Sequence, residues 1–194
     1  MSFRVTRKGL FAAGAGGAGA AVVGGAIADW PGVARSAPSA QQDVRVLTFV
    51  LGLERIEAAF YAEAQRAGAL RGELLEFVEV VGDHERQHVA FLEQALSAQA
   101  APVTLEAAEK VKDERRFAAT ASVLEDAIVS AYIGQATNLT PERLAQAATI
   151  ASVEARHAAW IRDIVGEPPA DDPTDVSRTA DQVRSILRRE GLLP

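Results

Sequence analysis

Hydrophobic positions recur every three or four residues along four long stretches of this 194-residue chain. In the first stretch, Leu47, Val50 and Leu51 begin a stripe that continues to Tyr61, and the other three stretches repeat this spacing. Because an α-helix completes a turn in about 3.6 residues, the spacing places the apolar side chains on one face. The pattern therefore predicts four amphipathic helices, at residues 44–67, 73–98, 114–137 and 141–165.

Residues that favour helix ends stand at the borders of these stretches. Asp43 is predicted to cap the first helix, and Thr140 followed by Pro141 is predicted to begin the fourth. Glycines at 68 and 72 predict a turn between the first two helices, and Gly166 predicts the end of the fourth. The predicted elements are thus separated by short, well-marked breaks.

The connection between the second and third helices is longer than the other two. Residues 100–113 give it enough length for a crossover between two helical hairpins, with room for a short helix. Two hairpins with apolar stripes bury those stripes best against each other. The chain is therefore predicted to be all-α, with an up-down four-helix bundle at residues 43–166 and a tail at 167–194 that contains a short helix near 175–190.

The first 28 residues are predicted to be an export signal. Arg4, Arg7 and Lys8 precede a long uncharged run that is rich in Gly and Ala and ends at the small-x-small sequence 26–28. A basic start, a weakly apolar centre and a small-residue cleavage site are features of secretory signals. The protein is therefore expected in the periplasm, in the cell envelope or outside the cell.

The export route and the cleavage of this segment are open to two interpretations. Residues 6–11 resemble a twin-arginine signal, but Lys8 stands where the second arginine is usual. An uncleaved segment would be near spanning length and would tether the protein to a membrane. No other stretch is predicted to span a bilayer, and residues 29–42 are predicted to be a linker.

Charge and cysteine content narrow the classes of partner and ligand. The net charge is −6, and an acidic protein is not expected to have nucleic acid as its main partner. The chain has no cysteine, which excludes disulfides, thiolate zinc sites and iron–sulfur clusters. Any metal ligands must therefore be Glu, Asp or His.

Two Glu-x-x-His motifs point to a metal site. They are Glu85 with His88 and Glu154 with His157, and together they include two of only three histidines in the chain. Residues three apart lie on one face of a helix, so a carboxylate and an imidazole in each motif can hold the same ion.

The chain also contains an internal repeat. Leu53-Glu54 with Tyr61 in the first hairpin corresponds to Leu124-Glu125 with Tyr132 in the second, and the two Glu-x-x-His motifs correspond in the same way. Each predicted helix therefore carries either one Glu or one Glu-x-x-His. Tyr61 and Tyr132 lie two turns beyond their Glu partners, and their hydroxyls are predicted to hydrogen-bond ligand carboxylates on facing helices.

This arrangement resembles the ferritin-like superfamily of di-iron carboxylate proteins, in which two helices supply a Glu and two others supply Glu-x-x-His. The sequences around Glu54, Glu125 and Glu154 are most similar to an exported ferritin-like domain family, and the resemblance covers residues 43–166.

The resemblance implies a dinuclear centre of two iron or manganese ions. Glu54, His88, Glu125 and His157 would be mostly terminal ligands, whereas Glu85 and Glu154 would tend to bridge. It further implies that O2 or peroxide reaches open coordination positions and oxidises a diferrous pair, which is oxidase or ferroxidase chemistry.

Other readings of the same residues remain open. Glu57, Glu63 and Asp126 are alternative ligands, although charged helical residues usually face solvent. His84-Glu85-Arg86-Gln87-His88 also matches the zinc-protease signature, in which His84 and His88 would bind zinc. His84 has no histidine counterpart in the repeat, which favours a surface or supporting role. A non-enzymatic envelope bundle is a further alternative, and the sequence leaves the substrate, the electron donor and the oligomeric state undetermined.

Overall fold

The structure is a computed structural model that describes residues 38–97, 103, 105 and 107–193. The predicted export signal, most of the predicted linker and the start of the crossover lie outside the described residues. All regular secondary structure in the described part of the chain is helical.

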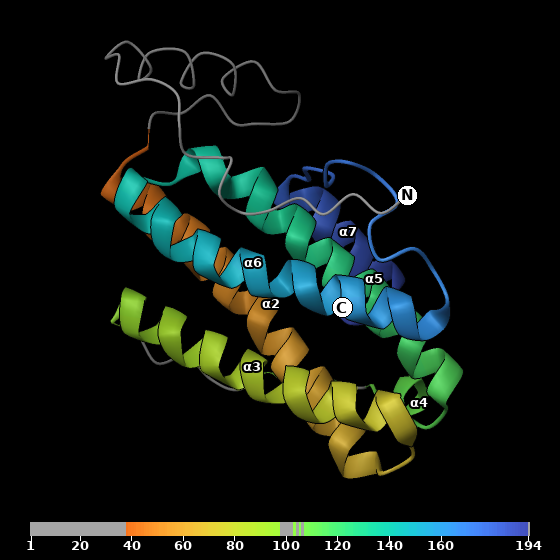
Figure 1. The fold of residues 1–194 in the computed structure, drawn as a ribbon. Coiled ribbons are helices and arrows are strands. Elements are labelled where there is room, and N and C mark those ends of the chain that lie inside the picture. Colours follow the sequence, from red (N-terminus) through yellow and green to blue (C-terminus); the bar gives the residue numbers. More distant parts are fainter. Residues whose placement is uncertain (1–37, 98–102, 104, 106, 194) are drawn as a thin grey trace, which may run out of the picture. The chain divides into compact units, whose positions relative to one another are not determined.

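Two helical hairpins form the bundle (Figure 1). Helix α2 (Ala40–Ala67) pairs with α3 (Gly72–Leu96), and α5 (Glu114–Gln135) pairs with α6 (Pro141–Val165). Contacts between α2 and α5 and between α3 and α6 join the two hairpins. The predicted all-α bundle of two hairpins is therefore confirmed.

Three shorter helices accompany the bundle. Helix α4 (Ala108–Val111) lies in the crossover, and the 3-10 helix η1 (Ala136–Asn138) follows α5. The tail helix α7 (Ala180–Arg189) packs against α5 and starts with a capping box formed by Thr179 and Gln182. The tail is thus part of the folded unit, and its helix is shorter than the predicted range.

The start of the first helix differs from the prediction. Ser39 caps α2 by accepting a hydrogen bond from the backbone N–H of Gln42 at 3.2 Å, so the helix begins before Asp43. Asp43 instead accepts hydrogen bonds from the backbone N–H of Thr140 at 2.8 Å and from its hydroxyl at 2.7 Å. The Thr140 hydroxyl therefore ties the beginning of α6 to α2 and does not cap its own helix.

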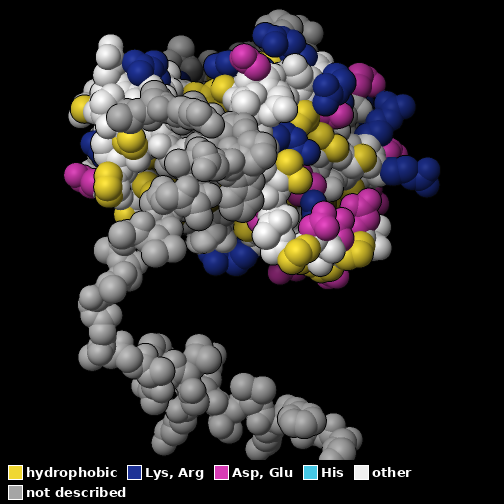
Figure 2. Space-filling view, turned by 90° about the horizontal axis from the view of Figure 1, so that it is seen from above, with side chains coloured by type: hydrophobic (Ala, Val, Ile, Leu, Met, Phe, Trp, Pro, Cys, Tyr) yellow, Lys and Arg dark blue, Asp and Glu magenta, His cyan; other side chains and the backbone are white. Residues whose placement is uncertain are grey.

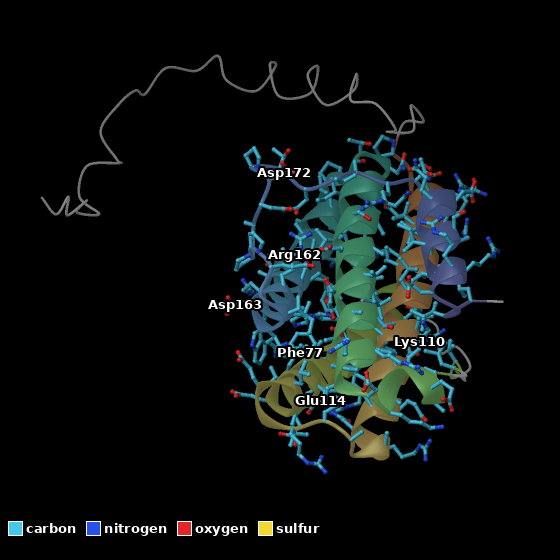
Figure 3. All side chains as sticks on the ribbon, turned by 90° about the vertical axis from the view of Figure 1, so that its right-hand side faces the viewer. Phe77, Lys110, Glu114, Arg162, Asp163 and Asp172 are labelled. Atoms are coloured by element: carbon cyan, nitrogen blue, oxygen red, sulfur yellow. The ribbon has the colours of Figure 1, made fainter. Side chains whose placement is uncertain are left out.

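An aromatic cluster fills one end of the core. Phe60, Tyr61, Phe77 and Phe117 are fully buried, and their ring centroids lie 5.4 to 6.5 Å apart. Most of the pairs are edge-to-face, which the aromatic quadrupole favours. Figure 3 shows Phe77 at the end of the bundle where α5 begins. The cluster fixes α2, α3 and α5 against one another next to the metal-ligand candidates.

Two glycines allow close packing beside this core. A Cβ atom on Gly82 would lie 3.2 Å from the Cβ of Tyr61, so its absence lets α3 approach α2. A Cβ atom on Gly134 would lie 1.9 Å from the carbonyl oxygen of Arg178. The backbone N–H of Arg178 also donates to the carbonyl of Ser130, and the tail backbone therefore lies directly on α5.

Helix α5 with η1 is long and apolar enough to cross a membrane by length and composition alone. However, 72% of its most apolar window is buried inside the bundle. The helix is this apolar because it is buried against α2, α6 and α7. On the face shown in Figure 2, described acidic and basic side chains are interspersed among apolar ones.

Candidate metal centre

All six candidate ligands point into the middle of the bundle. Helices α2 and α5 each supply one glutamate, and α3 and α6 each supply a Glu-x-x-His pair. The four carboxylate residues have no exposed surface, and the two histidines are 9% or less exposed. The residues are Glu54, Glu85, His88, Glu125, Glu154 and His157.

The six residues form two groups that share one member. The His88 group contains Glu54, Glu85, His88 and Glu154, and the His157 group contains Glu125, Glu154 and His157. Within each group, the potential ligand atoms lie within 4.8 Å of one another. The structure thus brings together all of the ligands that the repeat predicted.

Two carboxylates reach both imidazoles. Glu85 places Oε2 3.3 Å from Nδ1 of His88 and Oε1 3.2 Å from Nδ1 of His157. Glu154 places Oε1 2.8 Å from Nδ1 of His88 and Oε2 3.7 Å from Nδ1 of His157. Each carboxylate therefore has one oxygen on the side of each histidine.

The other two carboxylates each approach a single imidazole. Glu54 Oε2 lies 3.2 Å from Nδ1 of His88, and Glu125 Oε2 lies 3.6 Å from Nδ1 of His157. Each of these two carboxylates therefore belongs to only one of the two groups.

Several of these buried atoms have no hydrogen-bond partner among the described residues. They are one oxygen each of Glu85 and Glu125, both oxygens of Glu154, and Nδ1 of His157. These atoms lie close to the other candidate ligands without making hydrogen bonds to them. Buried polar atoms are costly when unpaired, and carboxylate oxygens with imidazole nitrogens suit iron or manganese. The residues therefore fit metal ions.

The two tyrosines make the hydrogen bonds that the sequence predicted. The hydroxyl of Tyr132 on α5 donates to Oε1 of Glu54 on α2 at 2.5 Å, and the hydroxyl of Tyr61 on α2 donates to Oε1 of Glu125 on α5. Each bond occupies one carboxylate oxygen and leaves the other facing a histidine. The tyrosines thereby orient the two terminal carboxylates.

His84 contacts His157 rather than the carboxylates. Its Nδ1 lies 2.9 Å from Nε2 of His157, and the two rings stack with centroids 5.2 Å apart. This places His84 behind His157, whose Nδ1 faces the glutamates. His84 and His88 are therefore not arranged as the joint zinc ligands of a protease, and His84 supports the orientation of His157.

The alternative ligands separate into two kinds. Glu57 is fully buried beside the six residues, and neither of its carboxylate oxygens has a partner among the described residues. Asp126 instead accepts a hydrogen bond from Arg162 at 2.7 Å, and Glu63 pairs with Arg66. Arg162 is labelled on α6 in Figure 3. Of the three, only Glu57 belongs with the buried carboxylates, and its spacing of three from Glu54 was the sequence signal for this.

Burial and mutual contact shift the pKa values in opposite directions. Burial lowers the pKa of His88 and His157, but the surrounding carboxylates outweigh it and raise both values to about 12. Burial raises the pKa of Glu125 to about 8, whereas the two histidines overcome burial and lower the pKa of Glu85 to about 2. The metal-free centre therefore holds protons at neutral pH, and metal binding must release them.

These shifts predict that the metal-free protein becomes less stable as pH rises. The pKa of Glu125 is 4.5 in the unfolded chain and about 8 in the fold, so its stabilisation is lost across that interval. The pKa values of His88 and His157 rise from 6.5 to about 12 and act in the same direction. Glu85 acts oppositely, but only below pH 4.5.

Thermal unfolding in the presence of a chelator measures this effect. The melting temperature should be lower at pH 8 than at pH 5, because the folded state binds more protons than the unfolded state across this interval. A melting temperature that rises over this interval would contradict the assignment of these protonation states. The metal-loaded protein is the control, since its ions replace the protons.

A groove between α3 and α6 borders the two histidines. It has a volume of about 460 Å³, and both His88 and His157 contribute to its wall. The remaining lining residues are Val80, His84, Gln87, Val153, Arg156 and Trp160. The groove therefore exposes one side of the site, at the two histidines, to small molecules.

The bundle and its buried Glu and Glu-x-x-His residues define a ferritin-like helical protein with a cluster that can hold metal ions. In agreement, residues 42–167 match the family described as the ferritin-like domain, and the chain belongs to that family. Comparison with curated proteins finds no match.

Proposed function

We propose that the protein binds two iron or manganese ions, one in the His88 group and one in the His157 group, and that this pair reacts with O2 or peroxide. The observation that carries the proposal is the position of Glu85 and Glu154, each with one oxygen toward each imidazole. Carboxylates placed in this way serve two ions at once. A single mononuclear site has no use for two such residues.

Charge and ligand chemistry support two divalent ions. Four carboxylates among the six ligands match the charge of two such ions, and hard oxygen ligands with imidazole suit iron and manganese. Without cations, four buried carboxylates remain together only by retaining protons or borrowing charge from the histidines. Metal binding therefore relieves an electrostatic cost that the fold carries.

The chain's own residues would prepare the site for oxidation chemistry. When bound, the metal pair supplies the electrons that reduce O2 or peroxide. Tyr61 and Tyr132 hold the terminal carboxylates, and His84 holds the ring of His157. The groove along α3 and α6 admits small molecules, while burial of the carboxylates excludes bulk water.

The protein is also proposed to be exported from the cytoplasm. The basic start and the uncharged Gly- and Ala-rich run of residues 1–28 support export to the periplasm, the cell envelope or the exterior. Retention of this segment would instead support a membrane-tethered form. Fractionation of cells, with the mass of the mature chain, distinguishes these two outcomes.

A structural role is the second candidate, because the same buried charges would let metal stabilise the bundle without turnover. An anaerobic Fe(II) titration of the full chain, followed by air, tests both. The di-iron proposal expects two Fe(II) per chain and new near-ultraviolet absorbance after exposure to air. Uptake of iron without any oxidation would favour the structural role.

Two other outcomes would contradict the di-iron proposal. Tight uptake of a single zinc ion, abolished by replacement of His84, would favour the protease alternative. No uptake of iron, manganese or zinc would contradict every metal reading, and the repeat would then serve only the packing of the bundle.

A further inference from the structure

Two residues break the internal repeat at the metal centre. The counterpart of Glu57 in the second hairpin is Ile128, which is buried and apolar. The counterpart of His84 is Val153. A perfectly repeated chain would present two equivalent metal positions, so these departures show where the two positions must differ.

The His84 departure lies on the side of the His157 group. His84 contacts His157 directly, as described above. Glu57 lies on the inner face of α2 between Glu54, one turn before it, and Tyr61, one turn after it. Because Glu54 belongs to the His88 group and Tyr61 bonds to Glu125, Glu57 lies along the stripe from the first group toward the second.

Like Glu154, the Glu57 side chain is buried, and neither of its oxygens has a hydrogen-bond partner among the described residues. Burial is the largest cause that raises the pKa of Glu57. The negative charge of Glu125 is the second largest cause, and the charges of Glu85, Glu154 and Glu54 contribute less. A buried carboxylate without a hydrogen-bond partner is costly unless it binds a cation or keeps a proton.

We propose that Glu57 is a seventh protein ligand, bound to the metal ion of the His157 group, and that it makes the two metal positions inequivalent. This inference rests on the dinuclear site proposed above. The His157 position then has two carboxylates of its own, Glu57 and Glu125, in addition to the shared Glu85 and Glu154. The His88 position has only Glu54 of its own, because Ile128 offers no ligand atom.

The inequivalence has a thermodynamic consequence. An additional anionic ligand strengthens binding of the ion that it contacts and favours a higher charge on that ion. The His157 position should therefore bind its ion more tightly than the His88 position. The Nε2 contact with His84 adds to this difference, because a fixed imidazole is a better ligand.

The test is an anaerobic Mn(II) titration of the full chain by calorimetry, with electron paramagnetic resonance to count bound ions. Wild type should bind two ions with separable affinities. Glu57→Gln should lower the tighter affinity by about 10- to 100-fold or more, since even indirect partners of metal ligands have effects of that size. The weaker affinity should change by much less.

Glu63→Gln is the matched control, because Glu63 lies on the same helix and pairs with Arg66 away from the site. It should leave both affinities unchanged. Thermal unfolding without metal separates binding from folding. The Glu57→Gln protein should be at least as stable as wild type there, because a neutral amide replaces a buried acid.

A double variant assigns the affected ion. Glu54→Gln should weaken the ion of the His88 group, so the effects of Glu54→Gln and Glu57→Gln should fall on different ions. If Glu57→Gln binds both ions with wild-type affinities, Glu57 is not a ligand and this inference is wrong, while the dinuclear proposal stands. If wild type itself binds fewer than two ions, the dinuclear proposal fails and this inference fails with it.

Discussion

Replacing Glu154 with glutamine should abolish tight binding of both metal ions. Among the described residues, Glu154 alone belongs to both the His88 group and the His157 group. Its two oxygens face the two imidazoles, and neither oxygen has a hydrogen-bond partner among the described residues. The amide keeps the shape of the side chain but removes the charge that both ions would share.

The expected loss of metal affinity in Glu154→Gln follows from the behaviour of other metal sites. Loss of an indirect partner costs about 10- to 100-fold in affinity, so loss of a shared direct ligand should cost at least the upper part of that range for each ion. Titration with Mn(II) or Fe(II) at concentrations that saturate wild type should show little or no bound metal in Glu154→Gln.

An exposed residue on the same helix provides the control. Glu142 is exposed in the first turn of α6, several turns before Glu154. The Glu142→Gln protein should therefore bind two ions as wild type does. Melting of metal-free Glu154→Gln should show an intact fold, because removal of one of several buried carboxylates lowers their repulsion. If one ion still binds with wild-type affinity, the two groups do not depend on a shared Glu154.

Removing the metal should produce the largest change in stability. An ion that binds only the folded state stabilises it by about 4 kcal/mol when its free concentration is 1,000 times its dissociation constant. Two such ions would add about 8 kcal/mol, because each ion contributes separately. For a chain of this length, that corresponds to a rise in melting temperature of roughly 16 to 32 °C.

The measurement compares chelated and metal-loaded protein in urea and by thermal unfolding. The denaturation midpoint should rise strongly with added Mn(II) and fall again with a chelator. Glu154→Gln serves as the control, since it should show almost no metal-dependent shift. Equal midpoints for chelated and loaded wild type would mean that folded protein does not bind the ions preferentially.

The fold was largely predictable because helix periodicity is a local property. The stripe that includes Val50 and Tyr61 identified α2 from its spacing alone, and the cap at its start was the detail that failed. Ser39 and Asp43 are both good N-cap residues, so local propensity cannot choose between them. Asp43 instead bonds to Thr140, which lies far along the chain, directly before α6.

The candidate site was predictable to the extent that the repeat expresses it. Glu-x-x-His spacing and the paired Glu and Tyr residues predicted the six side chains that the structure brings together, and also the bonds from Tyr61 and Tyr132. The burial of Glu57 beside these six residues was harder to predict. A glutamate three residues from Glu54 can face either the core or solvent, depending on how the helix is rotated in the bundle.

The sequence by itself determined the helices, the hairpin repeat and the identity of the candidate ligands, because spacing along one helix decides which residues share a face. Only the tertiary structure decided which oxygen faces which imidazole, that His84 lies behind His157, and that Glu57 is buried without a partner. Those facts depend on the rotation and distance of separate helices, which are set by packing such as the close approach at Gly82.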